Sequence, residues 1–344
     1  MKTPTALLVL LALAWSDGVI VPGPNSEIYS GGQVALVKYH DGVEQLHFFV
    51  VLNSGSSGRA AWLIPLPSAP TVQDGGVLIF EELSRLSVPV RQDYGYYGCE
   101  EGLDCDGSYS GAELEYADEY FELIGQRQLA GLTAVVIHTN NADSIKAWLT
   151  NNGYTTPADA IALFGEYIAK DWTYFFAAKI DSAAGYYYHA VGVKLTFATS
   201  EPIYPMRISS SNSYRNYYGG PLSIPLFLYV IADNKMIFDD AQLKYANDLN
   251  GDEVSKIGVD MPVLRSLLAP GDFLTKLAKE YGSAAEMSQD IMLRPAPDND
   301  EYRELLGEGN YYYYGNATLW LIVLYPCYLA YRRVRRLLSR KRRS

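Results

Sequence analysis

The chain has 344 residues, of which 49% are hydrophobic and 19% are charged, so it is long and apolar enough to bury a substantial core. This composition excludes an intrinsically disordered chain, and three cysteines are too few for a disulfide-dense scaffold. The net charge of −11 is unevenly distributed, because eight of the 28 basic residues lie in the last 13 positions. The remaining body is strongly acidic and therefore lacks the basic surface that nucleic-acid binding requires.

The amino terminus has the pattern of a secretory signal peptide. Lys2 precedes an apolar run over residues 6–14, and the small residues Ala14 and Ser16 stand at the −3 and −1 positions of a cleavage site. We therefore predict a signal peptide over residues 1–16 and an exported protein. The alternative is an uncleaved first membrane helix, although the apolar run is short for one.

The first part of the body, residues 33–67, alternates apolar and polar residues as β-strands do. The dipeptide Asp41-Gly42 separates two such runs and indicates a tight hairpin. The further elements that spacing and end signals predict are strands at 60–64, 113–124, 129–139, 172–180, 188–198, 203–209 and 224–231, and helices at 78–86, from the cap Asp143 to the stop Gly153, and at 157–170, 262–268, 272–281 and 285–293.

The predicted fold class is α+β, mostly antiparallel β-sheet with inserted helices, in one extracytoplasmic domain over residues 17–308. Its later part, about residues 260–295, is expected to be more helical. Gly-, Tyr- and Asp-rich loops interrupt the pattern, the longest of them over residues 92–112.

The carboxyl-terminal region has the pattern of a membrane anchor. No charged residue stands between Glu308 and Arg332, a span of 23 positions, and a helix rising about 1.5 Å per residue would cross a hydrocarbon core in that length. We predict a transmembrane helix over residues 309–331 and a basic cytoplasmic tail over 332–344. The residues expected to anchor it are Trp320, Arg332, Arg333, Arg335 and Arg336.

This pattern predicts a single-pass cell-membrane protein whose amino-terminal domain lies outside the cytoplasm. Two alternatives remain open for the same segment, a buried soluble helix followed by a basic tail, and a sorting tail that is removed after export. Export would allow Cys99 and Cys105 to form a disulfide, with an unpaired or metal-bound state as the alternative. The third cysteine, Cys327, lies inside the predicted membrane helix.

Six segments together resemble the prokaryotic domain-of-unknown-function family 2330. They are QVALVKYHDGVEQLHFFV, AAWLIPLPSAP, IFEEL, SIKAWLTNNGY, YIAKDWTYFFAAKI and VGVKLTFATSEPIYPMRIS, and they cover roughly residues 30–210 in order. The resemblance implies an exported, often membrane-anchored protein with no assigned activity, and it supplies no catalytic residues. Members often have a cysteine soon after the signal peptide, and its absence here argues against a lipoprotein anchor.

No catalytic motif stands out in the chain. A nucleophile elbow is missing, because Tyr109 occupies the centre of the Gly-x-x-x-Gly segment, and no phosphate-binding glycine loop is present. An enzyme is therefore not the favoured interpretation, but a cell-envelope hydrolase using paired carboxylates stays open as the alternative. The acidic residues considered for it are Glu113, Glu115, Asp118 and Glu119, for which a solvated strand face is the simpler interpretation.

Metal binding has only weak signals, and no other cofactor is expected. The four histidines, His40, His47, His138 and His189, do not share a helical face, so a surface or hydrogen-bonded structural role is expected for each. Two acidic loops partly match calcium-binding spacing but lack the glycine that such a loop needs. The calcium candidates are Asp104, Asp106 and Glu115 in one loop and Asp248, Asn250 and Asp252 in the other.

Tyrosine is the most suggestive residue type, with 29 copies gathered in part into loops. A tyrosine ring is rigid and amphipathic, which suits recognition of a protein or glycan. The candidate binding residues are Tyr94, Tyr96, Tyr97, Tyr109, Tyr186, Tyr187, Tyr217 and Tyr218. The sequence thus predicts a membrane-tethered binding domain, with the carboxylate hydrolase and a structural subunit of an envelope complex as alternatives.

Overall fold

The structure is a computed structural model that describes residues 14–15, 18–23, 30–53, 59–91, 132–181, 188–212, 223–249, 257 and 261–306. The chain divides into two compact units. The first comprises Met1–Val88 and Ser108–Tyr302, and the second comprises Pro89–Gly107 and Arg303–Ser344. Only residues 89–91 and 303–306 of the second unit are described.

The larger sheet has nine strands within the described residues, in the order β18-β14-β15-β12-β3-β4-β10-β6, and β1 also pairs with β3. Strands β12 and β1 run parallel to β3, whereas the β3–β4, β4–β10, β10–β6, β12–β15 and β14–β15 pairs are antiparallel. The strands are β1 (Ala14–Trp15), β3 (Ser30–His40), β4 (Val43–Asn53), β6 (Thr71–Asp74), β10 (Tyr188–Ala198), β12 (Ile224–Ala232), β14 (Gln242–Asp248), β15 (Phe273–Tyr281) and β18 (Tyr302–Arg303).

The smaller sheet is antiparallel, with the order β2-β5-β9-β8. Its strands are β2 (Val19–Pro22), β5 (Arg59–Leu66), β8 (Leu132–His138) and β9 (Tyr174–Asp181). β5 and β9 pair over eight residues, so they form the centre of this sheet, and β8 lies at one of its edges.

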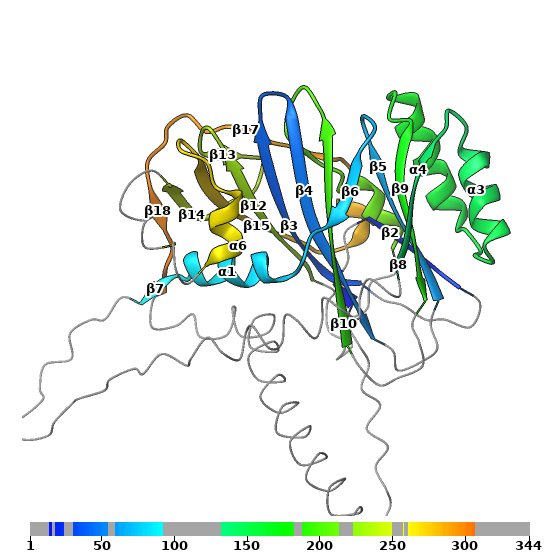
Figure 1. Ribbon diagram of the computed structural model, residues 1–344, viewed down its shortest axis with the longest axis horizontal. Coiled ribbons are helices and arrows are strands. Elements are labelled where there is room, and N and C mark those ends of the chain that lie inside the picture. Colours follow the sequence, from blue (N-terminus) through cyan, green and yellow to red (C-terminus); the bar gives the residue numbers. More distant parts are fainter. Residues whose placement is uncertain are drawn as a thin grey trace, which may run out of the picture. The chain divides into compact units, whose positions relative to one another are not determined.

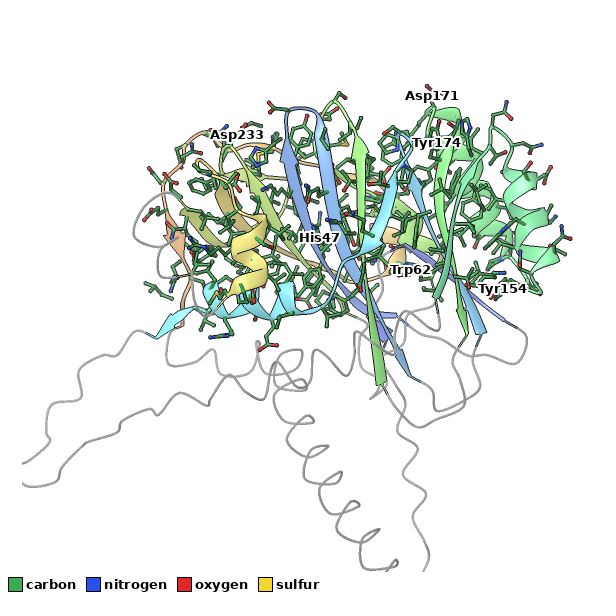
Figure 2. The ribbon with its side chains drawn as sticks, viewed as in Figure 1. His47, Trp62, Tyr154, Asp171, Tyr174 and Asp233 are labelled. Carbon is green, nitrogen blue, oxygen red and sulfur yellow. The ribbon has the colours of Figure 1, made fainter. Side chains whose placement is uncertain are left out.

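The two sheets pack face to face around an aromatic centre. Trp62 on β5 contacts Phe48 on β4 and Phe176 on β9 edge to face, with ring centroids 5.0 and 5.6 Å apart. These three side chains belong to one buried cluster that also includes apolar residues of β3, β10 and β12. The sheets are therefore the two inner layers of a sandwich, with Trp62 between them (Figure 2).

Helices cover the outer face of each sheet. Phe164 of a helix packs against Phe175 behind the smaller sheet, and Leu83 packs with Leu36 behind the larger one. The first unit therefore has four layers, helix–sheet–sheet–helix (Figure 1). The helices are α1 (Leu78–Leu86) and α6 (Pro262–Leu267) on the larger sheet, and α3 (Ala142–Asn151) and α4 (Ala158–Ala169) on the smaller one.

Several short elements complete the described chain. They are the antiparallel pairs β11 (Ile203–Tyr204) with β16 (Ile291–Met292) and β13 (Met236–Ile237) with β17 (Arg294–Pro295), the parallel pair β7 (Val90–Arg91) with β19 (Leu305–Leu306), and the 3₁₀ helices η1 (Arg207–Ser211) and η2 (Ala284–Glu286).

The α+β class and the first hairpin are confirmed. Asp41 and Gly42 both have positive φ, as a two-residue hairpin turn requires. The strand at 188–198 and the helix at 78–86 are found with the predicted bounds. Of the predicted strand at 203–209, only its first two residues form a strand.

Three helical predictions were wrong. Residues 273–281 of the predicted helix 272–281 form strand β15, and residues 285–293 contribute part of a 3₁₀ turn and a short strand, so the region 260–295 is not mainly helical. Asn141, not Asp143, caps α3, because the Asn141 side chain accepts a hydrogen bond from the Asp143 N–H. Asp143 instead stands in the first turn, where its charge favours the helix dipole.

The predicted export and anchor segments fall almost wholly outside the described residues. Residues 309–331 are not described, and in the part of the chain that is, no helix is long and apolar enough to cross a membrane. Of the predicted signal peptide, Ala14 and Trp15 are described and pair with the start of β3.

Candidate functional site

One end of both sheets is where tyrosine-rich segments join the scaffold. Tyr188 at the start of β10 pairs with Asn53 at the end of β4, and Arg59 at the start of β5 pairs with Asp181 at the end of β9. Connections of only five and six residues join these strand ends, so the two sheets end next to each other. We call this the loop end, and it is the lower edge of the sheets in Figure 1.

Two further segments reach the scaffold at the loop end. Ile224 begins β12 after the segment 213–222, and Leu132 begins β8 after the segment 92–131. The registers of β12 against β3 and of β8 against β9 place both strand starts at this end. All eight candidate tyrosines lie outside the described residues, but each belongs to a segment that borders one of these strand starts: Tyr94, Tyr96, Tyr97, Tyr109, Tyr186, Tyr187, Tyr217 and Tyr218.

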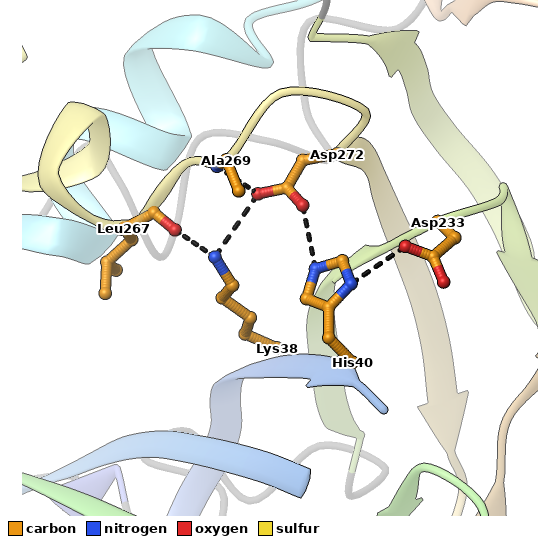
Figure 3. Close-up of polar contacts among 6 residues, drawn as sticks. All are labelled: Lys38, His40, Asp233, Leu267, Ala269 and Asp272. Carbon is orange, nitrogen blue, oxygen red and sulfur yellow. Dashed lines mark hydrogen bonds and ion pairs between the residues drawn. The ribbon is translucent and has the colours of Figure 1, made fainter. Parts of the chain in front are cut away.

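The opposite end of the larger sheet carries a charged cluster (Figure 3). His40 ends β3, Asp233 follows β12 and Asp272 precedes β15, and the strand registers bring the three residues together. His40 Nδ1 lies 2.8 Å from Asp233 Oδ1, and His40 Nε2 lies 2.7 Å from Asp272 Oδ1. The first contact is a hydrogen bond, whereas the second is a close approach of the ring to the carboxylate without hydrogen-bond alignment.

Asp272 is the buried centre of this cluster, with its side chain only 1% exposed. Its Oδ2 accepts a hydrogen bond from the Ala269 N–H at 2.7 Å and lies 3.3 Å from Lys38 Nζ. Lys38 also donates to the carbonyl of Leu267 at the end of α6. A buried carboxylate is stable only when paired, so these contacts fix the α6–β15 connection to the end of β3.

The chemistry that this cluster can perform is limited by its own pairing. Both ring nitrogens of His40 face carboxylates, so neither is directed at a substrate atom. Asp272 is occupied by Lys38, His40 and a backbone N–H. The geometry is that of a structural closure of the sheet end, which agrees with the structural role expected for His40.

His47 lies in the middle of β4 and is 4% exposed. Neither of its ring nitrogens has a hydrogen-bond partner in the described part of the chain. Burial, followed by the charges of Lys194 and Lys38, lowers the pKa of His47 to about 4, so its ring is neutral at pH 7. The expected surface or hydrogen-bonded role was therefore wrong for this histidine, because it pairs with Leu36 on the face of the larger sheet that α1 and α6 cover.

Glu44 is a second ionisable side chain that β4 buries. Its Oε2 accepts a hydrogen bond from the Ile203 N–H at 2.8 Å, whereas Oε1 has no partner among the described residues. Burial raises the pKa of Glu44 well above its usual value, and the Ile203 hydrogen bond offsets this only in part. The fold therefore favours the neutral carboxylic acid.

Glu82 on α1 caps the neighbouring helix α6. Its carboxylate accepts hydrogen bonds from the backbone N–H groups of Leu264 at 2.6 Å and Val263 at 3.3 Å. Burial raises the pKa of Glu82, and these two hydrogen bonds oppose the rise. α6 is thus fixed at its start by Glu82 and at its end by Lys38.

The two described carboxyl groups whose pKa values are raised do not pair with each other. Glu44 and Glu82, whose pKa values are raised, belong to different layers and are each engaged by backbone N–H groups. The four acidic residues proposed for a hydrolase lie outside the described residues: Glu113, Glu115, Asp118 and Glu119.

The predicted calcium and disulfide residues are almost all outside the described residues as well. Asp248 is described, and it is the exposed last residue of β14. Over the described ranges, no three His, Cys, Asp or Glu side chains are grouped so that they could hold a metal ion. The calcium and disulfide residues outside those ranges are Asp104, Asp106, Glu115, Asn250, Asp252, Cys99 and Cys105.

The sequence did not identify the partners of His40. Asp233 is 193 residues from His40, and Asp272 is 234 residues from Lys38. No local spacing links residues so far apart, and only the strand order β15-β12-β3 brings them together. A signal was present in their positions, because each polar residue stands at the end of a strongly apolar strand.

Comparison with known proteins gives one family and one distant structural match. No curated protein matches the chain. A mutated baculovirus P35, solved after caspase cleavage, is similar over 77% of this chain and 100% of its own, at 8% identity and a TM-score of 0.30, which does not establish a shared fold. The family described as uncharacterised proteins conserved in bacteria, DUF2330, matches residues 11–294. Because this match spans most of the chain, the protein belongs to the DUF2330 family of uncharacterised bacterial proteins.

Proposed function

We propose that this protein is a membrane-anchored extracytoplasmic domain that binds a protein or glycan partner through tyrosine-rich segments at its loop end. The observation that carries the proposal is the strand register, which places the starts of β8, β10 and β12 at one end of the sheets. In the sequence, a tyrosine-bearing segment precedes each of these three strands. Rigid scaffolds commonly present recognition residues on such neighbouring connections. Tyrosine supplies large contact area with little loss of conformational entropy.

The cellular placement in this proposal is supported by the two ends of the sequence. Residues 1–16 have the pattern of a signal peptide, and residues 309–331 form an uncharged span followed by the arginine cluster. An extracytoplasmic position would also allow the proposed disulfide between Cys99 and Cys105. The acidic body fits a partner recognised by apolar and hydrogen-bonding contacts better than an anionic one.

The test uses the full-length protein with Tyr186, Tyr187, Tyr217 and Tyr218 changed to Ser. Binding is measured on a glycan array and by crosslinking in intact cells of the source bacterium. The proposal expects the parent's bound species to be lost, with a thermal midpoint equal to that of the parent, because recognition residues on connecting segments are not needed for packing of the scaffold.

The matched control is Val43→Ser, an exposed residue beside the β3–β4 turn at the opposite end of the same sheet. This variant is expected to keep the bound species. Retention of the same species by the tyrosine variant would overturn the proposal, as would its equal loss from the Val43→Ser variant.

A further inference from the structure

The described part of the second unit is a pair of parallel strands. Val90 pairs with Leu305 and Arg91 pairs with Leu306. We call residues 89–91 and 303–306 the stem. In a parallel pair both chains run the same way, so the segments that follow Arg91 and Leu306 leave the stem on the same side.

The two segments that leave the stem are those singled out in the sequence. The uncharged span begins at residue 309, three positions after Leu306. The tyrosine-rich segment reaches Tyr94 three positions after Arg91. Three residues of extended chain reach at most about 10 Å. The stem is therefore within about 10 Å of the first residue of the span, close to the thickness of one interfacial layer, roughly 5–8 Å.

The stem also exposes apolar surface. Leu305 is 54% exposed, more than any other large apolar side chain among the described residues. Val88 and Tyr302, the last residues of the first unit before each strand of the stem, are exposed as well. A single exposed leucine is common on protein surfaces. Here exposed apolar residues lie in or beside both strands of the stem, and a candidate membrane span follows in the sequence. Contact with the lipid interface would explain their exposure.

We propose that the stem lies at the lipid–water interface, with Leu305 in contact with the bilayer. The proposal rests on the membrane anchor of the proposed function. Its occupant is the lipid surface because the chain that follows Leu306 supplies an apolar span within reach, followed by arginines that fix its direction. One consequence is that the segment containing Tyr94 starts at the membrane surface.

The experiment uses the full-length protein in vesicles of phosphatidylethanolamine and phosphatidylglycerol. The photo-crosslinking residue p-benzoylphenylalanine replaces Leu305 in one variant and Tyr302, an aromatic position, in a second. A third variant carries it at Val43, a described exposed residue of the first unit. After illumination, mass spectrometry identifies lipid or peptide adducts at each position.

The expected result is lipid adducts at Leu305 and Tyr302 and none at Val43. Peptide adducts in place of lipid at Leu305 would overturn the proposal in favour of a protein contact, as would the absence of lipid adducts at both Leu305 and Tyr302. Lipid adducts at Val43 equal to those at Leu305 would also overturn it. Carbonate extraction of the vesicles separates the stem proposal from the proposed membrane anchor. Release of the parent chain by carbonate would contradict the anchor itself.

Discussion

The two ends of the larger sheet are built differently. At the charged end, β3 and β4 are joined by the two-residue turn Asp41-Gly42, and Lys38, His40 and Asp272 close the strand ends through paired charges. At the loop end, the strands continue into segments of five residues or more, several of them rich in tyrosine. The sheet therefore has one end closed by a tight turn and paired polar groups, and one end where the tyrosine-rich segments join the strands.

The difference indicates a division of labour within one scaffold. Charged contacts at the closed end cannot be lost without leaving a buried charge unpaired, so they constrain the sequence there. Connections between strands usually tolerate changes in sequence, and this applies to the segments that join the strands at the loop end. Recognition is thus expected at the loop end, and stability is expected to depend on the charged end.

The Asp272→Ala substitution is the strongest test of whether stability depends on the charged end, and it should have the largest effect. It removes the buried partner of Lys38 and His40 and the acceptor of the Ala269 N–H, so the free energy of unfolding should fall by about 3–5 kcal/mol. Denaturant unfolding measures the change. Asp233→Ala is the matched control, because Asp233 is 73% exposed and its loss should cost less than about 1 kcal/mol. Equal losses in the two variants would show that the cluster is not centred on Asp272.

His47, in the middle of β4, should make the free energy of unfolding depend on pH. The folded state holds the pKa of His47 at about 4, below its ordinary 6.5, so it binds this proton more weakly than the unfolded state does. The contribution of His47 to stability is therefore complete above pH 6.5 and is lost as the pH falls toward 4. His47→Leu should remove up to roughly 3 kcal/mol of that acid loss, as measured by unfolding at pH 7 and pH 4. Parallel pH profiles for parent and variant would contradict the prediction.

Glu44 should act at the other side of the pH range. Its pKa is raised by burial, so its contribution is complete below its ordinary value of 4.5 and is lost as the pH rises through the folded-state pKa. Glu44→Gln keeps an acceptor for the Ile203 N–H and does not ionise. It should be more stable than the parent at pH 8 by roughly 1–3 kcal/mol and equal to it near pH 4. A variant less stable than the parent at both pH values would refute this.

The smallest expected effect concerns the start of α6. Glu82→Ala removes the acceptor for the Leu264 and Val263 N–H groups and should cost about 1 kcal/mol, the usual value of a helix cap. The exposed neighbour Glu81→Ala is the control and should stay within about 0.5 kcal/mol of the parent. Indistinguishable thermal midpoints for these two variants would argue against the cap.

The fold could be predicted where the sequence pattern is local. Alternation and the Asp41-Gly42 turn were enough for the β3–β4 hairpin, and one-sided helical spacing was enough for α1. β15 was mistaken for a helix because it lies between β12 and β14 and is buried on both faces. Burial of both faces removes the two-residue period, and the apolar residues Phe273, Leu274, Leu277 and Tyr281 then imitate helical spacing.

The candidate sites could be predicted only by residue type. Tyrosine-rich segments were visible from composition. That the strands after them, β8, β10 and β12, all begin at one end follows only from strand order and register. The charged cluster depends wholly on long-range pairing, since Lys38 meets Asp272 across 234 residues. Single-sequence patterns contain no term for such a pairing, because each partner by itself resembles an ordinary polar residue at a strand end.

The contacts of β2 also constrain the order in which the chain can fold during synthesis. Gly18 and Ile20 both bond to Asn212, which is made 194 and 192 residues later. At about 5–20 residues per second, those contacts wait roughly 10–40 s for their partner to be made. Strand β2 therefore cannot complete these contacts until Asn212 has been made.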